Sequence, residues 1–269
     1  MIHILLFLLT VGSTYFVGGT SYSVSIMSIL LAHEMGHYFM SKKHGIPSTL
    51  PYFIPFPLSP FGTFGAIIKM KGIILNKKAL FDIGVAGPIS GFIVAVPFIV
   101  IGISLSDIQP VSGSPSFIEL GDPLLFKIVQ RLLIGEIPAG QDIVLHPFAY
   151  AGWVGLFVTA LNLLPVGQLD GGHIIYAVFG DKSKWIFFGT IVILAVVAIF
   201  YNPGWLMLVI ILIIFGMRHP KPLDTETKLD RKRKYFAFAI LIIFILSFTP
   251  APFPSLISEK TDKIGGIPI

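Results

Sequence analysis

Residues 22–41 read YSVSIMSILLAHEMGHYFMS, a run of twenty residues without a lysine or an arginine. At a rise of about 1.5 Å per residue, a helix of this length crosses the roughly 30 Å hydrocarbon core of a bilayer. The stretch is mostly apolar, yet it carries three ionisable side chains within five positions, namely His33, Glu34 and His37. It therefore predicts a membrane-spanning helix with a polar cluster inside it.

The composition of the whole chain agrees with a membrane protein. Of the 269 residues, 54% are hydrophobic and 12% are charged, whereas a soluble domain usually carries about 25% charged residues. This excludes an ordinary soluble protein and predicts an all-α polytopic membrane protein with about six to seven transmembrane helices. The apolar segments lie near residues 2–20, 22–41, 80–106, 148–179, 185–201, 204–217 and 235–250.

The positions of the basic residues predict the orientation. If the N-terminus is cytoplasmic, 15 of the 19 lysines and arginines fall in the loops 42–79, 180–184 and 218–234. This distribution follows the positive-inside rule, so the net charge of +5 points to membrane lipid and not to nucleic acid. We expect a multi-pass protein of the cell membrane, with the N-terminus and the active-site side in the cytoplasm.

The cluster in residues 22–41 has the pattern His-Glu-x-x-His. Two histidines four residues apart share one face of a helix, so the imidazoles of His33 and His37 can reach one zinc ion. Glu34 projects beside such an ion, where its carboxylate can take a proton from the activated water. The chain has no cysteine, which excludes thiolate ligands and leaves histidine, aspartate and glutamate as metal ligands.

Chance and other functions explain this pattern less well than a metal site. A chain of this composition contains the pattern by chance about 0.003 times, and ionisable residues in a membrane helix are functional by default. The plainest alternative is a polar cluster that binds a proton, another ion or a partner helix. An ion-coupled transporter or metal carrier needs the ligands but no general base, and a non-catalytic scaffold homologue would usually lack Glu34 or a histidine.

A second polar site falls where Leu164-Pro165-Val166-Gly167 interrupts the segment 148–179. A broken helix at membrane depth is tolerated only where protein or a water-filled cavity satisfies the freed backbone groups. A catalytic zinc needs a third protein ligand, and Asp170, directly after the break, is the best candidate. His173 is the competitor, because it lies one helical turn further on and could ligate the metal or support Asp170.

Other polar and small residues of the spans have two possible roles each. The Asn162 amide can donate to a developing oxyanion or make an interhelical hydrogen bond. Gly87 and Gly91 form a small-xxx-small pair that favours close helix packing, and Asp82 suits the N-terminal end of a helix. The remaining histidines fall at termini or in loops and are expected to be solvated: His3, His44, His146 and His219.

Residues 47–71 are predicted to be non-helical, because five prolines precede the sequence Gly62-Thr63-Phe64-Gly65-Ala66-Ile67-Ile68. The latter predicts one or two strands at the cytoplasmic interface. The longest hydrophilic loop, residues 107–147, is too short for a typical independent domain.

Together, His33-Glu34-x-x-His37, Asn162-x-x-Pro165 and Leu169-Asp170-Gly171 make the sequence resemble the site-2 protease family of zinc intramembrane metalloproteases. The resemblance covers about residues 22–180, the expected catalytic core. It leaves residues 1–21 as an N-terminal transmembrane helix and residues 181–269 as additional transmembrane helices with a C-terminal tail.

The resemblance implies one zinc ion per chain, bound by His33, His37 and Asp170, with Glu34 as the general base and Asn162 near the catalytic centre. It implies an endopeptidase that cleaves transmembrane substrate proteins, as in regulated intramembrane proteolysis. The stretch Gly62 to Met70 is similar to the family's membrane-associated strands, which would hold an unwound substrate by backbone hydrogen bonds. The chain has no room for the family's frequent PDZ domain and looks more like the PDZ-less members, including those related to plastid proteins.

Overall fold

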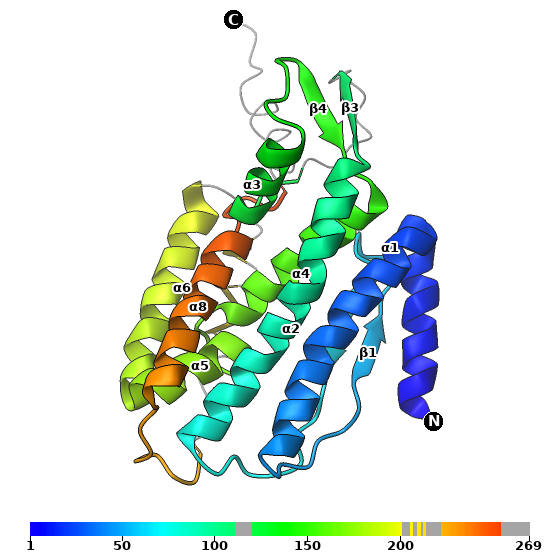
Figure 1. Ribbon diagram of the computed structural model, residues 1–269. Coiled ribbons are helices and arrows are strands. Elements are labelled where there is room, and N and C mark those ends of the chain that lie inside the picture. Colours follow the sequence, from blue (N-terminus) through cyan, green and yellow to red (C-terminus); the bar gives the residue numbers. More distant parts are fainter. Residues whose placement is uncertain (111–119, 201–204, 207–208, 211, 214–221, 254–269) are drawn as a thin grey trace, which may run out of the picture.

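The computed structural model describes residues 1–110, 120–200, 205–206, 209–210, 212–213 and 222–253 (Figure 1). These residues are mostly helical, with two small antiparallel sheets of two strands each. Three described helices are long and apolar enough to cross a membrane: Ile2–Lys43, Lys77–Ser104 and Asp170–Phe200. The apolar segment 204–217 lies largely outside the described residues.

The first helix, α1 (Ile2–Lys43), folds back on itself at Gly19. The backbone of Gly19 has φ 72° and ψ −170°, a conformation that is essentially restricted to glycine. Hydrogen bonds between the two halves hold this turn: the hydroxyls of Thr14 and Ser23 lie 2.8 Å apart, and the Ser23 hydroxyl donates to the Val11 carbonyl at 3.2 Å. The halves run side by side in Figure 1 and correspond to the predicted segments 2–20 and 22–41.

The second helix, α2 (Lys77–Ser104), packs against α1, α4 (Pro147–Leu163) and α5 (Asp170–Phe179). It begins at Asn76, whose side-chain oxygen accepts a hydrogen bond from the backbone of Ala79 at 2.9 Å. Buried apolar side chains of α1, α2 and α4 form one core, with Tyr22, Ile99 and Trp153 fully buried. This core packs α1, the helix that carries His33, Glu34 and His37, against α2 and α4.

The predicted interruption of segment 148–179 separates α4 from α5. Within it, backbone groups bond locally: the Val166 N–H donates to the Leu164 carbonyl, and the Leu169 N–H donates to the Val166 carbonyl. A side chain at Gly171 would collide with the Leu163 carbonyl, and one at Gly172 with the Gly167 carbonyl. The two glycines therefore let the second half-helix start close to the end of the first.

The predicted strand region forms a hairpin of β1 (Tyr52–Pro55) and β2 (Thr63–Ile67). Its base is closed by a bridge between Ser48 and Met70, near the end of α1. Its tip bonds residues on either side of the Gly19 turn, so the hairpin extends along α1. Three hydroxyls hold the tip: Ser13 donates to the Gly62 carbonyl, Tyr22 to the Phe61 carbonyl and Tyr150 to the Pro60 carbonyl.

A second hairpin, which the sequence analysis did not predict, pairs β3 (Asp107–Pro110) with β4 (Gln141–Val144). It lies with α3 (Leu124–Leu133) at the end of the molecule away from the α1–α2 connection (Figure 1). The remaining described elements are the short η1 (Gly180–Lys182), α6 (Ser183–Phe200) and α8 (Arg231–Ser247).

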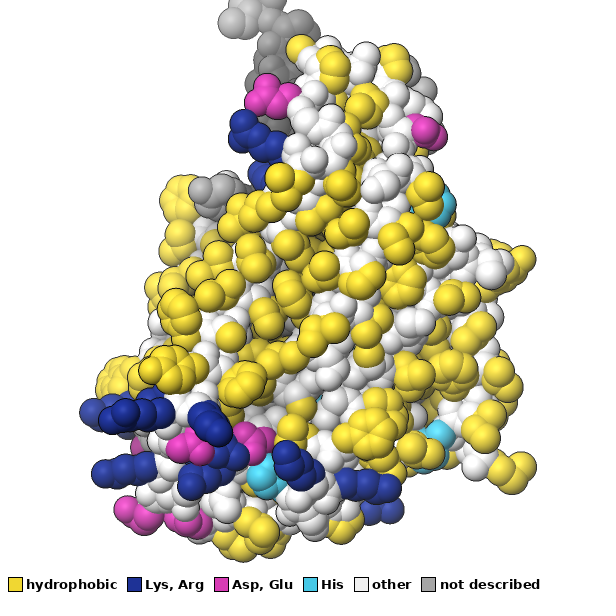
Figure 2. Space-filling view, in the orientation of Figure 1, with side chains coloured by type: hydrophobic (Ala, Val, Ile, Leu, Met, Phe, Trp, Pro, Cys, Tyr) yellow, Lys and Arg dark blue, Asp and Glu magenta, His cyan; other side chains and the backbone are white. Residues whose placement is uncertain are grey.

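Hydrophobic side chains cover the middle of the face shown in Figure 2, and lysines and arginines gather at one end of it. Many large apolar residues of the described chain are exposed, among them Phe39, Ile93 and Phe236. Such a surface is stable in lipid and not in water. The structure thus agrees with an integral membrane protein.

Candidate metal centre

Two helices bring the predicted metal ligands together. His33 and His37 are buried on α1, with relative exposures of 4% and 7%, and their Nε2 atoms lie 3.1 Å apart. Asp170 is the first residue of α5, and its Oδ2 lies 3.3 Å from each of the two nitrogens. Among the described residues, these three form a cluster whose ligand atoms all lie within 4.8 Å of one another.

The geometry of this cluster fits one zinc ion. Ligand atoms about 2.0 to 2.1 Å from a tetrahedral zinc are separated from one another by about 3.3 Å, close to the observed 3.1 and 3.3 Å. The Nδ1 of His37 donates to the Ile83 carbonyl at 2.8 Å, so in the neutral ring Nε2 presents a lone pair to the cluster. Because that lone pair faces a carboxylate oxygen, a cation between them removes the repulsion.

Glu34 is buried beside the cluster, with a relative exposure of 7%. Its carboxylate lies close to the backbone of Ile68, directly after β2. This contact joins the β1–β2 hairpin to the centre. The Glu34 carboxylate therefore lies between the three-residue cluster and the end of a strand.

The two remaining candidates lie at different distances from the cluster. Asn162, in the last turn of α4, places its Nδ2 3.4 Å from the Nε2 of His33. His173 is buried one turn after Asp170 and packs close to Gly84 of α2. Among the described residues, the three-residue cluster includes Asp170 and does not include His173.

Gly87 and Gly91, expected from their spacing to allow close helix packing, lie against the two histidines. A Cβ atom at Gly87 would overlap the imidazole of His37, and one at Gly91 would lie 3.2 Å from the Cβ and Nδ1 of His33. These glycines thus form the wall of the centre on α2. Gly87 and Gly91 are four residues apart, like His33 and His37. This equal spacing was the sequence signal by which the contact between the glycines and the histidines could have been predicted.

The sequence profile described as "Peptidase family M50" matches residues 21–201. The chain belongs to peptidase family M50. This membership confirms the resemblance to site-2 proteases that the motifs indicated. The matched range includes every residue of the cluster, together with Glu34 and Asn162.

Two plant relatives of this M50 member illustrate the similarity. Over 169 residues it is 37% identical to "Probable zinc metalloprotease EGY1, chloroplastic" of Oryza sativa subsp. japonica, covering 60% of this chain and 28% of that protein. Over 246 residues it is 31% identical to "Probable zinc metalloprotease EGY2, chloroplastic" of Oryza sativa subsp. indica, covering 87% of this chain and 43% of that protein. The chain thus spans less than half the length of these relatives.

Among solved structures, the M50 chain is similar to the site-2 protease from Methanocaldococcus jannaschii. The TM-score is 0.39 and the sequence identity is 18%, with 85% of this chain and 93% of that chain covered.

Two expectations about polar residues of this M50 member were wrong. Asp82 is not a charge at the N-terminal end of α2, whose first turn holds no acidic residue; its carboxylate instead pairs with Arg233 and His44. His44 is therefore bonded within the protein and not simply solvated. His146 caps α4 by accepting from the Phe148 backbone at 3.2 Å, and His219 lies outside the described residues.

Proposed function

We propose that this M50 member is an intramembrane zinc metalloendopeptidase that hydrolyses a peptide bond of a transmembrane protein substrate. The observation that carries the proposal is the geometry of His33, His37 and Asp170, whose ligand atoms meet at zinc-like separations. Two of the three lie on α1, a helix of membrane-spanning composition. Both plant relatives are named as probable zinc metalloproteases, which supports the same activity.

In this proposal each residue of the centre has a separate task. His33, His37 and Asp170 hold the metal, and Ile83 orients the ring of His37 through its carbonyl. Zinc bound there would polarise a water molecule and lower its pKa toward about 7. Glu34 accepts the proton of that water and later delivers it to the leaving amine.

Asn162 is proposed to stabilise the transition state. Its amide lies 3.4 Å from the Nε2 of His33, at the edge of the ligand cluster, so it can donate a hydrogen bond to an oxyanion that forms there. Removing such a donor in other hydrolases costs about 100-fold to 1000-fold in kcat.

The β1–β2 hairpin is proposed to hold the substrate. A peptide bond inside a helix is shielded by the helix itself, so the substrate must be unwound before its carbonyl can approach the centre. Among the described residues, β2 pairs only with β1, and the residue after β2 contacts Glu34. An extended substrate segment added to this hairpin would satisfy its backbone groups and lie beside the base.

We infer six to seven membrane spans, a catalytic core at about residues 22–180 and additional helices in residues 181–269. The basic end, where α1 ends and α2 and α8 begin, is proposed to face the cytoplasm or, in an organelle, the equivalent compartment. His33 lies nine residues before Lys42, about 13 Å along the helix. The centre is therefore proposed to lie within the membrane but nearer its basic side.

The decisive experiment compares the purified wild-type chain with a Glu34→Gln variant in proteoliposomes, using a series of labelled transmembrane peptides as substrates. We expect the wild type to cleave and the variant to be inactive, while both retain one zinc per chain in metal analysis. Glu136→Gln is the matched control, because Glu136 is exposed at the other end of the molecule, and it should cleave normally. Cleavage by Glu34→Gln would refute the mechanism, and metal flux without hydrolysis would favour a carrier.

A further inference from the structure

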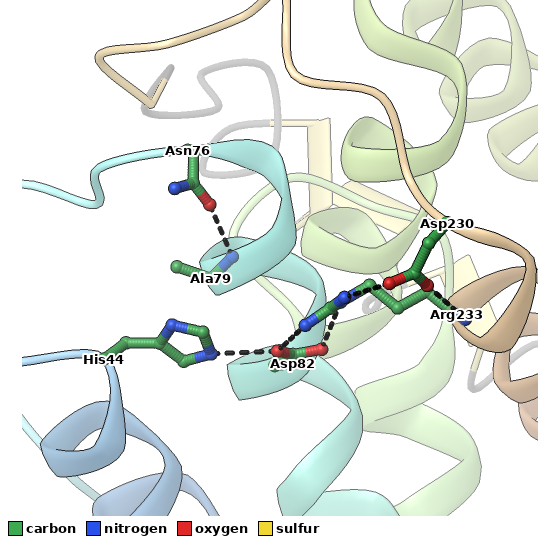
Figure 3. A network of polar contacts seen from close by, with 6 residues as sticks. All are labelled: His44, Asn76, Ala79, Asp82, Asp230 and Arg233. Atoms are coloured by element: carbon green, nitrogen blue, oxygen red, sulfur yellow. Dashed lines mark hydrogen bonds and ion pairs between the residues drawn. The ribbon is translucent and has the colours of Figure 1, made fainter.

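A group of charged side chains outside the metal centre joins three helices at the basic end of the molecule (Figure 3). The Asp82 carboxylate of α2 accepts hydrogen bonds from Nε of Arg233 at 2.8 Å and from Nη2 of Arg233 at 2.5 Å. Its Oδ2 also lies 2.9 Å from Nε2 of His44, the residue that ends α1. Asp82 of α2 is thus the common partner of His44 at the end of α1 and of Arg233 on α8, and we call this group the Asp82 latch.

Arg233 is held in position for this contact by Asp230, which caps α8. One Asp230 oxygen accepts from the backbone N–H of Arg233 at 2.9 Å, and the other accepts from its Nη1 at 2.7 Å. The guanidinium therefore lies between two carboxylates, and its planar fork matches Asp82 with two parallel bonds. The side chains of Arg233 and Asp82 are only 22% and 17% exposed, so this pair is far less screened than a surface salt bridge.

Asp82 directly precedes Ile83, a residue whose backbone contacts the metal centre. Ile83 follows Asp82, and its carbonyl accepts the Nδ1 proton of His37 at 2.8 Å. That hydrogen bond determines which nitrogen of His37 carries the proton and which way the ring points. A movement of α2 at Asp82 would therefore move the acceptor that orients a metal ligand.

The contact between α1 and α2 leaves little tolerance for such a movement. At Gly87 there is no room for even a methyl group beside the His37 ring. At Gly36 a Cβ atom would meet the Ala86 carbonyl at 2.5 Å and the Ser90 hydroxyl at 2.7 Å. Helices in backbone contact cannot approach further, and separating them would lengthen the bond between His37 and Ile83.

From these contacts we propose that Asp82 is a positioning residue for the metal centre. Its pairing with Arg233 and His44 holds α2 against the end of α1 and keeps the Ile83 carbonyl where it orients His37. The inference rests on the proposed zinc site, but it assigns a role to residues that do not touch the metal, the substrate or the reacting atoms.

The test measures zinc affinity by chelator competition on the purified full chain in lipid nanodiscs. We expect Asp82→Asn and Arg233→Gln each to bind zinc about 10-fold more weakly, the lower end of the range for partners of metal ligands. The double variant should lose no more zinc affinity than either single variant, because each single variant already breaks the ion pair between Asp82 and Arg233. Arg231→Gln is the matched control, since Arg231 lies two residues away on α8 and is exposed, and its affinity should equal that of the wild type.

A second readout separates positioning from general stability. The visible absorption of the cobalt-substituted protein reports ligand geometry, and we expect it to change in Asp82→Asn and Arg233→Gln at saturating cobalt but not in Arg231→Gln. If the neutral variants do not fold, the same measurements on Arg233→Lys test the proposal, because lysine keeps the positive charge but cannot make two parallel hydrogen bonds to Asp82. If the zinc affinity and cobalt spectra of the Asp82 and Arg233 variants match those of Arg231→Gln, the positioning role of Asp82 is refuted. A wild-type chain that binds no zinc would instead refute the proposed metal centre.

Discussion

His37 is the most constrained side chain of the metal centre. One ring nitrogen faces His33 and Asp170, the other donates to the Ile83 carbonyl, and Gly87 lies against the ring. A side chain held on three sides loses little further freedom when a metal binds, which favours binding. Substitutions around His37 should therefore affect metal binding strongly.

The first prediction concerns the ligand that comes from the second half-helix. Asp170→Ala removes one of three ligand atoms and leaves the two histidines four residues apart on α1. We expect zinc content to fall from one per chain to a small fraction, as measured by metal analysis after dialysis against a weak chelator. Asp107→Ala, at an exposed position of β3, should retain its zinc; full zinc content in Asp170→Ala would exclude Asp170 as a ligand.

The second prediction concerns the wall of the centre. In Gly87→Ala the new methyl group would overlap the His37 ring, and such overpacking typically costs about 1–3 kcal/mol of stability. We expect a lower melting temperature together with weaker zinc binding, measured on the same preparation. The control is Gly189→Ala on α6, where no heavy atom lies within 4 Å of the added carbon; equal behaviour of the two variants would contradict the described contact.

At the scale of elements, the main departure from a simple bundle is the turn inside α1. No residue other than glycine readily adopts the backbone angles of Gly19. The polar contacts between the two halves, such as that of Thr14 with Ser23, hold the N-terminal half beside the catalytic half. The N-terminal half also bonds the tip of the β1–β2 hairpin through Ser13. The helix α1 therefore positions both Glu34 and the hairpin.

The third prediction tests this turn. No atom lies within 4 Å of a Cβ added at Gly19, so Gly19→Ala should be destabilising through the backbone alone, by about 1–3 kcal/mol. Gly12→Ala is its matched control, because Gly12 lies in the same helix with equal free space and without a positive φ. Thermal unfolding of both variants checks the prediction, and a Gly19→Ala variant as stable as Gly12→Ala would contradict the turn.

The elements that could be predicted from sequence are those with a local cause. The interruption between α4 and α5 follows from Pro165, and the strand at Thr63–Ile67 follows from the prolines that exclude a helix before it. The β3–β4 hairpin was missed because both strands are four residues long and largely exposed. Such strands have no alternation of buried and exposed residues by which to find them.

At the scale of the whole molecule, the charge distribution and the helix directions together predict a seven-span topology. Asp142 and Glu226 lie at opposite ends of the molecule, and seven spans place them on opposite sides of the membrane. Six spans, with the segment 204–217 not crossing, would instead require both residues on one side, against their positions at opposite ends of the molecule.

The fourth prediction uses the absence of cysteine from the chain. Single variants Asp142→Cys and Glu226→Cys, both at exposed positions, can be labelled with an impermeant maleimide in sealed vesicles without background. We expect only one of the two to react before the membrane is permeabilised and both to react afterwards. Reaction of both in intact vesicles would contradict seven spans and favour six.

The sequence by itself determined the membrane class, the family and the candidate residues of the centre. These follow from local properties: the length of apolar runs, the cost of ionisable groups in lipid and the spacing of side chains on one helix. Only the tertiary structure decided that Asp170 meets the two histidines, that Gly87 and Gly91 face them, and that Asp82 pairs with Arg233. Those contacts join residues that are distant in the chain, and their partners are chosen by how the helices pack and not by their neighbours in sequence.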